Sequence, residues 1–157
     1  MAEANNAVFC NGRHNSALNL DVFDVHGKFD LVYIDTPYIS QKGVGVDYLS
    51  FYHFLEGLVN YSKCPQMIDY RTKHKRLKGS NCIWTDQKRI LSGFERLFSK
   101  FRDSIIVVSY RADGIPSIGQ LTALLAKYKP SVEGLRRKNY KYVLSTNNSE
   151  EVLLIGS

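Results

Sequence analysis

Cysteine, proline and long apolar runs are all scarce in this sequence of 157 residues. Its three cysteines, Cys10, Cys64 and Cys82, cannot all pair and match no zinc-binding spacing, so we expect reduced thiols in a cytoplasmic protein. No apolar run approaches the roughly 18 residues that a membrane span requires, and no export signal follows the first methionine. With 4 prolines, 23% charged and 44% hydrophobic residues, the composition excludes a disordered chain and predicts a single domain, residues 1–157.

Positive charge is concentrated in the second part of the chain. Up to Asn60 there are 3 Lys and Arg residues against 7 Asp and Glu, whereas from Tyr61 onward there are 18 against 8. This asymmetry favours contact with a polyanion such as DNA. A charged surface that serves solubility alone is the alternative interpretation.

Two basic clusters are candidates for that contact. The first, residues 70–80, has no apolar period and predicts a mobile surface loop. Its candidate DNA-binding residues are Arg71, Lys73, Lys75, Arg76 and Lys78. The second cluster interleaves cations with tyrosines and contributes Arg136, Arg137 and Lys138.

Hydrophobic patterns predict alternating strands and helices. Short, almost continuous apolar runs are typical of buried strands, and apolar residues at helical spacing indicate amphipathic helices. The expected elements, in order, are strand 29–35, helix 47–61, helix 85–101, strand 104–110, helix 117–129, and hairpin strands 140–145 and 150–155. Together they predict an α/β domain whose mostly parallel sheet ends in an antiparallel hairpin.

The string Asp35-Thr36-Pro37-Tyr38 directly follows the first predicted strand. In open α/β sheets, ligands bind beyond the carboxyl ends of the strands. The Asp35 carboxylate and the Thr36 carbonyl can each accept a hydrogen bond from an amino group, and Pro37 restricts the backbone. Tyr38 can stack on a base that has left the duplex. The string therefore predicts a site for an amino-bearing base, with a plain Asp-Thr-Pro turn as the alternative.

The segment around this string resembles the Asp-Pro-Pro-Tyr motif of adenine-specific DNA methyltransferases from bacterial restriction-modification systems, phages and plasmids. The resemblance extends from about residue 7 to residue 156. The blocks that carry it are Leu31–Tyr38, Tyr52–Glu56, Val108–Arg111 with Asp113–Ile115, and Tyr140–Ile155.

This resemblance implies a Rossmann-like fold and methyl transfer from S-adenosylmethionine to the N6 amino group of a flipped adenine in DNA. Methylation of an amino group on RNA or protein is a weaker alternative. On the family pattern, the catalytic residues are Asp35, Thr36, Pro37 and Tyr38, and the candidate cofactor contacts are Asn15 and Tyr110.

The sequence departs from the family pattern in three ways. First, Thr36 stands where the family usually has proline. Second, the glycine-rich cofactor motif Phe-x-Gly-x-Gly has no match, because neither Gly12 nor the Gly43-Val-Gly45 segment follows a strand and opens a helix. Third, only about thirty residues precede Asp35, where the family carries its cofactor half. The chain thus resembles the carboxyl-terminal half of a methyltransferase domain, for which binding S-adenosylmethionine alone is doubtful.

A strand at 31–34 without these neighbours would form a sheet edge, although its apolar character is typical of a strand paired on both sides. A complementary subunit carrying the cofactor half, a homodimer, or residues 7–10 folded back as a strand are the expected covers. The functional alternative to a methyltransferase half is a truncated, inactive DNA-binding relative.

Overall fold

A four-stranded sheet forms the centre of the computed structural model, which describes residues 12–43, 45, 47–79, 82–140 and 149–157. The strands stand in the order β1-β3-β6-β5 and are β1 (Leu31–Asp35), β3 (Ile105–Arg111), β6 (Ser149–Gly156) and β5 (Val132–Tyr140). A separate antiparallel pair joins β2 (Ile39–Ser40) to β4 (Gly114–Ile115).

The sheet is mixed, which confirms an α/β fold and corrects one detail of it. Strands β1 and β3 run parallel, with Leu31 opposite Ile105 and Asp35 opposite Ser109. Strand β6 runs antiparallel to both β3 and β5, so the expectation of a mostly parallel sheet is wrong. An apolar run indicates that a strand is buried, but its direction depends on how the chain enters the sheet.

The structure divides the first expected helix and shortens the others. The helical segments are η1 (Val22–Asp24), α2 (Tyr48–Phe51), α3 (His53–Val59), α4 (Cys64–Met67), η2 (Ile83–Thr85), α5 (Ile90–Lys100) and α6 (Ile118–Leu125). Among the residues described, no helix is long and apolar enough to cross a membrane.

Helix starts follow the local chemistry of the sequence. Asp47 caps α2 by accepting the Leu49 N–H at 3.2 Å, as expected for a carboxylate at this position. The predicted helix 47–61 breaks at Tyr52, whose φ of −106° and ψ of 29° are not helical. Ser117 and Gln120 form a capping box at the start of α6, with hydrogen bonds of 3.2 Å and 2.9 Å.

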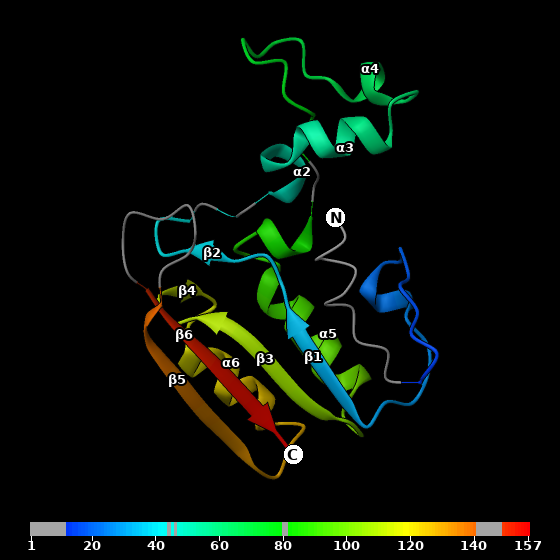
Figure 1. The fold of residues 1–157 in the computed structure, drawn as a ribbon. Coiled ribbons are helices and arrows are strands. Elements are labelled where there is room, and N and C mark those ends of the chain that lie inside the picture. Colours follow the sequence, from blue (N-terminus) through cyan, green and yellow to red (C-terminus); the bar gives the residue numbers. More distant parts are fainter. Residues whose placement is uncertain (1–11, 44, 46, 80–81, 141–148) are drawn as a thin grey trace.

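The core lies between one face of the sheet and helices α5 and α6, which both lie behind the sheet in Figure 1. Phe94 and Phe98 of α5 and Leu121 of α6 are fully buried there. Each such side chain stabilises the fold by about 1.5–3 kcal/mol. No described α-helix covers the opposite face, on which Leu31 and Tyr33 are 53% and 57% exposed.

The terminal hairpin is confirmed with a shifted first strand. Strand β5 begins at Val132, before the predicted start at residue 140, and pairs with β6 from Val132 opposite Gly156. Residues 141–145 of the predicted strand lie outside the described residues. The charged stretch in β5 shows no apolar alternation, which is why the sequence did not predict its strand. The basic cluster 136–138 is therefore part of this strand.

Candidate functional site

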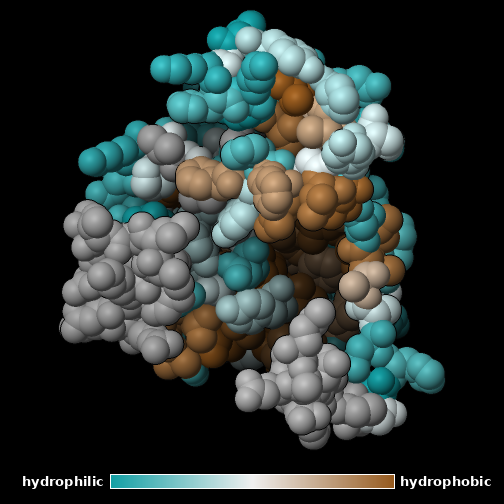
Figure 2. Space-filling model, turned by 45° about the horizontal axis from the view of Figure 1, so that its top comes forward, coloured by the Kyte–Doolittle hydropathy of each residue, from teal (hydrophilic) through white to brown (hydrophobic). Residues whose placement is uncertain are grey.

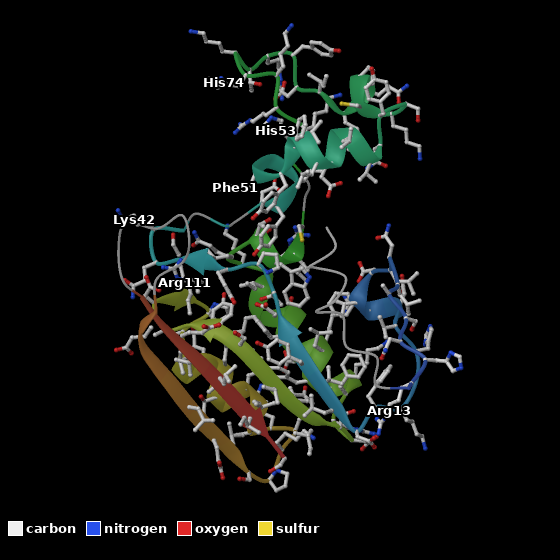
Figure 3. The ribbon with its side chains drawn as sticks, viewed as in Figure 1. Arg13, Lys42, Phe51, His53, His74 and Arg111 are labelled. Carbon is white, nitrogen blue, oxygen red and sulfur yellow. The ribbon has the colours of Figure 1, made fainter. Side chains whose placement is uncertain are left out.

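Polar side chains meet at the carboxyl ends of the central strands. Asp35 ends β1 and is exposed, and its neighbour across the parallel pair is Ser109 of β3. The Ser109 hydroxyl donates a hydrogen bond of 2.8 Å to the Glu151 carboxylate on β6. Figure 3 shows Arg111 at the same end of β3, where it forms an ion pair of 2.6 Å with Asp113. The strand ends thus gather polar side chains, and the predicted site for an amino-bearing base stays a prediction.

Tyr38 faces the carboxylate that precedes it. Its phenol donates a hydrogen bond of 2.7 Å to Asp35 Oδ1, and its ring is half-buried. No ion pair engages Asp35 within the described part of the chain. The carboxylate is exposed, with the Tyr38 phenol as a hydrogen-bond donor to it.

The ring of Tyr110 supports Tyr38 from the core. The two rings meet edge to face, with centroids 5.3 Å apart and planes at 83°. Tyr110 is fully buried, and its hydroxyl donates a hydrogen bond of 2.5 Å to the Ile115 carbonyl. Burial raises the pKa of Tyr110 to about 12, against smaller opposite effects of a hydrogen bond with the Ile39 backbone and of the charge on Arg111. Its predicted contact with a cofactor stays a prediction, and what the structure places here is a support for the site.

A cleft of about 410 Å³ opens beside the motif and is lined by residues of β1, an outer strand of the described sheet. This volume lies within the range of about 300–1,000 Å³ that small-molecule sites occupy. Asp35, Thr36 and Pro37 line it together with apolar side chains that include Phe29 and Trp84. On the face shown in Figure 2, hydrophobic surface gathers in and around a hollow below the projecting helices. The Thr36 side chain is buried, and its hydroxyl has no hydrogen-bond partner among the described residues.

Two tyrosines that the sequence did not indicate as site residues lie at the start of α2 and between α2 and α3. Tyr48 and Tyr52 stack with ring centroids 5.9 Å apart and planes at 13°. Burial, the negative charge of Asp35 and the neighbouring Tyr52 raise the pKa of Tyr48, in that order of importance. The helical spacing of these residues predicts an apolar helix face, and nothing local to the sequence indicates that this face lies near Asp35.

The described residues of the basic cluster, 70–79, form turns and irregular backbone, as expected for a loop, and their predicted mobility stays a prediction. The Asp69 N–H donates to the Arg76 carbonyl at 2.7 Å, and the Lys78 N–H donates to the Met67 carbonyl at 2.8 Å. Between them Leu77 is only 2% exposed. We call residues 67–78 the basic finger. The bridge between Ile68 and Leu77 and the buried Leu77 side chain fix the base of this loop.

The candidate DNA-binding residues of the basic finger differ in their surroundings. Lys73, Lys75 and Arg76 are exposed at or beside its tip. Arg71 forms an ion pair with Asp69, and the Lys78 ammonium donates a hydrogen bond of 3.1 Å to the Gln66 carbonyl. The side chains of residues 136–138 lie outside the described residues. Figure 3 shows His74 at the outer end of the finger, far from the sheet.

The described residues do not form a site that fits S-adenosylmethionine. Gly43 closes a tight turn, in which its N–H donates a hydrogen bond of 2.8 Å to the Ser40 carbonyl. Its φ of +77° explains why a glycine stands at this position. Gly45 lies against Thr85, where an added Cβ would come within 3.1 Å of the backbone. Asn15 is exposed ahead of β1, with its amide 3.4 Å from the Arg13 carbonyl. Its predicted cofactor contact stays a prediction.

Three methylases are similar to this chain in sequence. The modification methylase StsI of Streptococcus sanguinis is 32% identical over 139 residues, which are 82% of this chain and 18% of that protein. The Type II methyltransferase M2.HphI of Haemophilus parahaemolyticus is 27% identical over 94% of this chain and 40% of its own length. The Type II methyltransferase M.FokI of Planomicrobium okeanokoites is 25% identical over 90% of this chain and 21% of its own length.

The chain therefore spans well under half the length of each of these relatives. No protein-family model matches the chain, and no solved structure matches it. The similarity to methylases confirms the resemblance that the Asp-Thr-Pro-Tyr block and its companion blocks indicate.

Proposed function

We propose that this chain, which resembles the Type II DNA methyltransferases, is the target-base half of an adenine-specific DNA methyltransferase. One observation carries the proposal: the Asp35 carboxylate is exposed at the carboxyl end of β1, 2.7 Å from the Tyr38 phenol and beside an open cleft. A motif that served only as a turn would not require an accessible acceptor and an aromatic ring at the mouth of a cleft.

The residues of this site suit an exocyclic amino group. The Asp35 carboxylate and the Thr36 carbonyl are two acceptors for the two hydrogens of the amine, and the Tyr38 ring is a stacking surface for the flipped base. Stacking of a base on an aromatic side chain contributes about 1–3 kcal/mol. In this arrangement the phenol of Tyr38 leaves Asp35 when the base enters, because the amine takes its place on the carboxylate.

The methyl donor implied by the methylase relatives is S-adenosylmethionine, whose positive sulfur activates the methyl group for transfer. The described residues supply no site that fits it, so we assign this chain the base-holding role alone. We infer that a complementary segment or subunit holds the donor.

The free edge of β1 supports such a complement. Among the described strands, β1 pairs only with β3, which leaves its other edge unpaired beside the cleft. Leu31, Tyr33 and Ile105 also expose apolar surface on the uncovered face of the sheet. Edges and faces of this kind are normally covered by pairing or packing. A homodimer through the same edge is a competing arrangement, and residues 7–10, the third expected cover, lie outside the described residues.

DNA is the proposed substrate. The basic finger presents exposed Lys73, Lys75 and Arg76 on the part of the molecule that projects beyond the carboxyl end of β1 (Figure 1). Contacts from such cations to phosphates bind DNA without regard to sequence and weaken as salt rises.

A second candidate function, an inactive DNA-binding relative, is favoured by the lack of a fitting donor site among the described residues. Labelling separates the two. The chain is incubated with tritiated S-adenosylmethionine and adenine-containing DNA, with and without a neighbouring gene product that carries the glycine-rich motif. Label transferred to adenine supports the methyltransferase, whereas no label under either condition, together with salt-sensitive DNA retention, supports the binding protein.

A matched pair of variants tests the role of Asp35. Asp35→Ala should abolish label and barely change DNA retention. Asp103→Ala removes an exposed carboxylate just before β3, at the opposite end of the parallel strands, and should change neither. Equal loss of label in both variants, or loss of DNA retention together with label in Asp35→Ala, would contradict the assigned role.

A further inference from the structure

The basic finger holds one of its arginines in a fixed orientation. The Asp69 carboxylate accepts three hydrogen bonds from Arg71: from Nε at 2.9 Å, from Nη2 at 3.1 Å, and from the backbone N–H at 3.1 Å. Asp69 is itself fixed, because its backbone N–H donates to the Arg76 carbonyl and its own carbonyl accepts the Thr72 hydroxyl at 2.9 Å.

The two members of this pair differ sharply in exposure. The Asp69 side chain is 14% exposed and the Arg71 side chain is 89% exposed. The guanidinium lowers the pKa of the Asp69 carboxyl, so the carboxylate keeps its charge at neutral pH. One edge of the guanidinium faces Asp69, and the other edge, which includes Nη1, has no partner among the described residues.

An ion pair this exposed adds little to the stability of a fold. The ion pair matters more for orientation, because it gives the flexible Arg71 side chain a set direction, in which the guanidinium presents a planar pair of donors. A fork held in this way can bind two phosphate oxygens, as can the neighbouring Arg76. Guanine also presents two acceptors, O6 and N7, side by side in the major groove, and a fixed arginine fork matches them.

The finger itself has a shape that the major groove accepts. One antiparallel bridge between Ile68 and Leu77, with two backbone hydrogen bonds beside it, forms a short two-stranded stem, and residues 70–74 turn beyond it. The major groove, about 12 Å wide, admits a two-stranded ribbon. The finger projects with helices α3 and α4 away from the sheet, and its tip is the part most distant from the core in Figure 3.

We propose that the basic finger enters the major groove of duplex DNA and that Arg71, oriented by Asp69, reads a guanine there. Arg71 is then a specificity residue, and Lys73 and Arg76 contact phosphates. This inference rests on the proposed DNA substrate and adds to it the base that the finger recognises.

Sequence preference, measured without methyl transfer, tests the inference. The 157-residue chain is bound to a pool of duplexes with randomised central positions, and the retained duplexes are sequenced. Wild type should enrich guanine at one position by roughly 5- to 150-fold over other bases. Arg71→Lys should lose that enrichment, because an ammonium cannot form the fork, and Asp69→Asn should reduce it while circular dichroism remains that of wild type.

Lys73→Ala is the matched control. It should lower retention of all duplexes alike and reduce the salt slope by about one, with guanine enrichment unchanged. Equal enrichment in Arg71→Lys and wild type, or a wild type that binds duplexes without preference, would overturn the inference and leave the proposed function intact. A wild type that retains no duplex at all would overturn both this inference and the proposed DNA contact.

Discussion

The buried phenol of Tyr110 offers a quantitative test of the packing beneath the site. Replacing it with phenylalanine removes the hydroxyl that bonds the Ile115 carbonyl at 2.5 Å and keeps the ring that supports Tyr38. Leaving a buried carbonyl unpaired costs about 1–3 kcal/mol. At neutral pH we therefore expect Tyr110→Phe to lower the free energy of unfolding by that amount.

The difference in unfolding free energy between wild type and Tyr110→Phe should shrink at alkaline pH. The pKa of Tyr110 is about 12 in the folded chain, against an ordinary value of 10.0. Because the folded pKa is raised, the corresponding stability is complete below the unfolded pKa and is lost as the pH rises through the folded pKa. At 1.36 kcal/mol per unit, wild type should lose about 1.4 kcal/mol by about pH 11 and about 2–3 kcal/mol by about pH 12.

Urea unfolding followed by circular dichroism, repeated from neutral to alkaline pH, measures this difference. Tyr110→Phe lacks the titrating group, so its curve should converge on that of wild type. Val108→Ala, a truncation of a fully buried neighbour, should instead remain below wild type by a constant amount. A gap between wild type and Tyr110→Phe that stays constant across this pH range would refute the raised pKa.

Two further predictions address the surroundings of the motif. In Gly114→Ala, the added Cβ would lie 2.5 Å from a ring carbon of Tyr110, so we expect a loss of about 1–3 kcal/mol and a lower Tm. Gly119→Ala is the control, because its added Cβ lies in a helix with no atom closer than 3.9 Å, and it should raise the free energy of unfolding by about 0.5–1 kcal/mol. Equal Tm values for Gly114→Ala and Gly119→Ala would contradict this packing. Asp35→Asn should lower the pKa of Tyr48, because a negative charge that opposes phenolate formation is removed, although burial still holds it above the ordinary value. Ultraviolet titration with Tyr48→Phe as the reference checks this, and an unchanged titration would place Asp35 away from α2.

Several local features were predictable because their causes lie within a few residues. The apolar run before Asp35 predicts a strand that ends at the motif, and the structure has β1 end there. Side-chain oxygens at Asp47 and Ser117 predict helix starts, and both cap a helix. Turn chemistry between two β-rich segments predicts the terminal hairpin, although its first strand begins earlier than expected.

The basic finger shows what composition does not reveal. A run of cations with no apolar period predicts a loop, and within that loop Leu77 is buried and bridges to Ile68. One buried side chain and one backbone bridge produce no periodic signal in the sequence.

By itself, the sequence determined the end of the strand before Asp35, the helix caps at Asp47 and Ser117, and the Asp35–Tyr38 motif, since periodicity and capping act between near neighbours. Only the tertiary structure decided the antiparallel direction of β6, the approach of Tyr48 to Asp35, and the inward position of Tyr110 beneath Tyr38. These depend on which distant surfaces pack together, and the free energy of that packing comes from the whole core, not from any local segment.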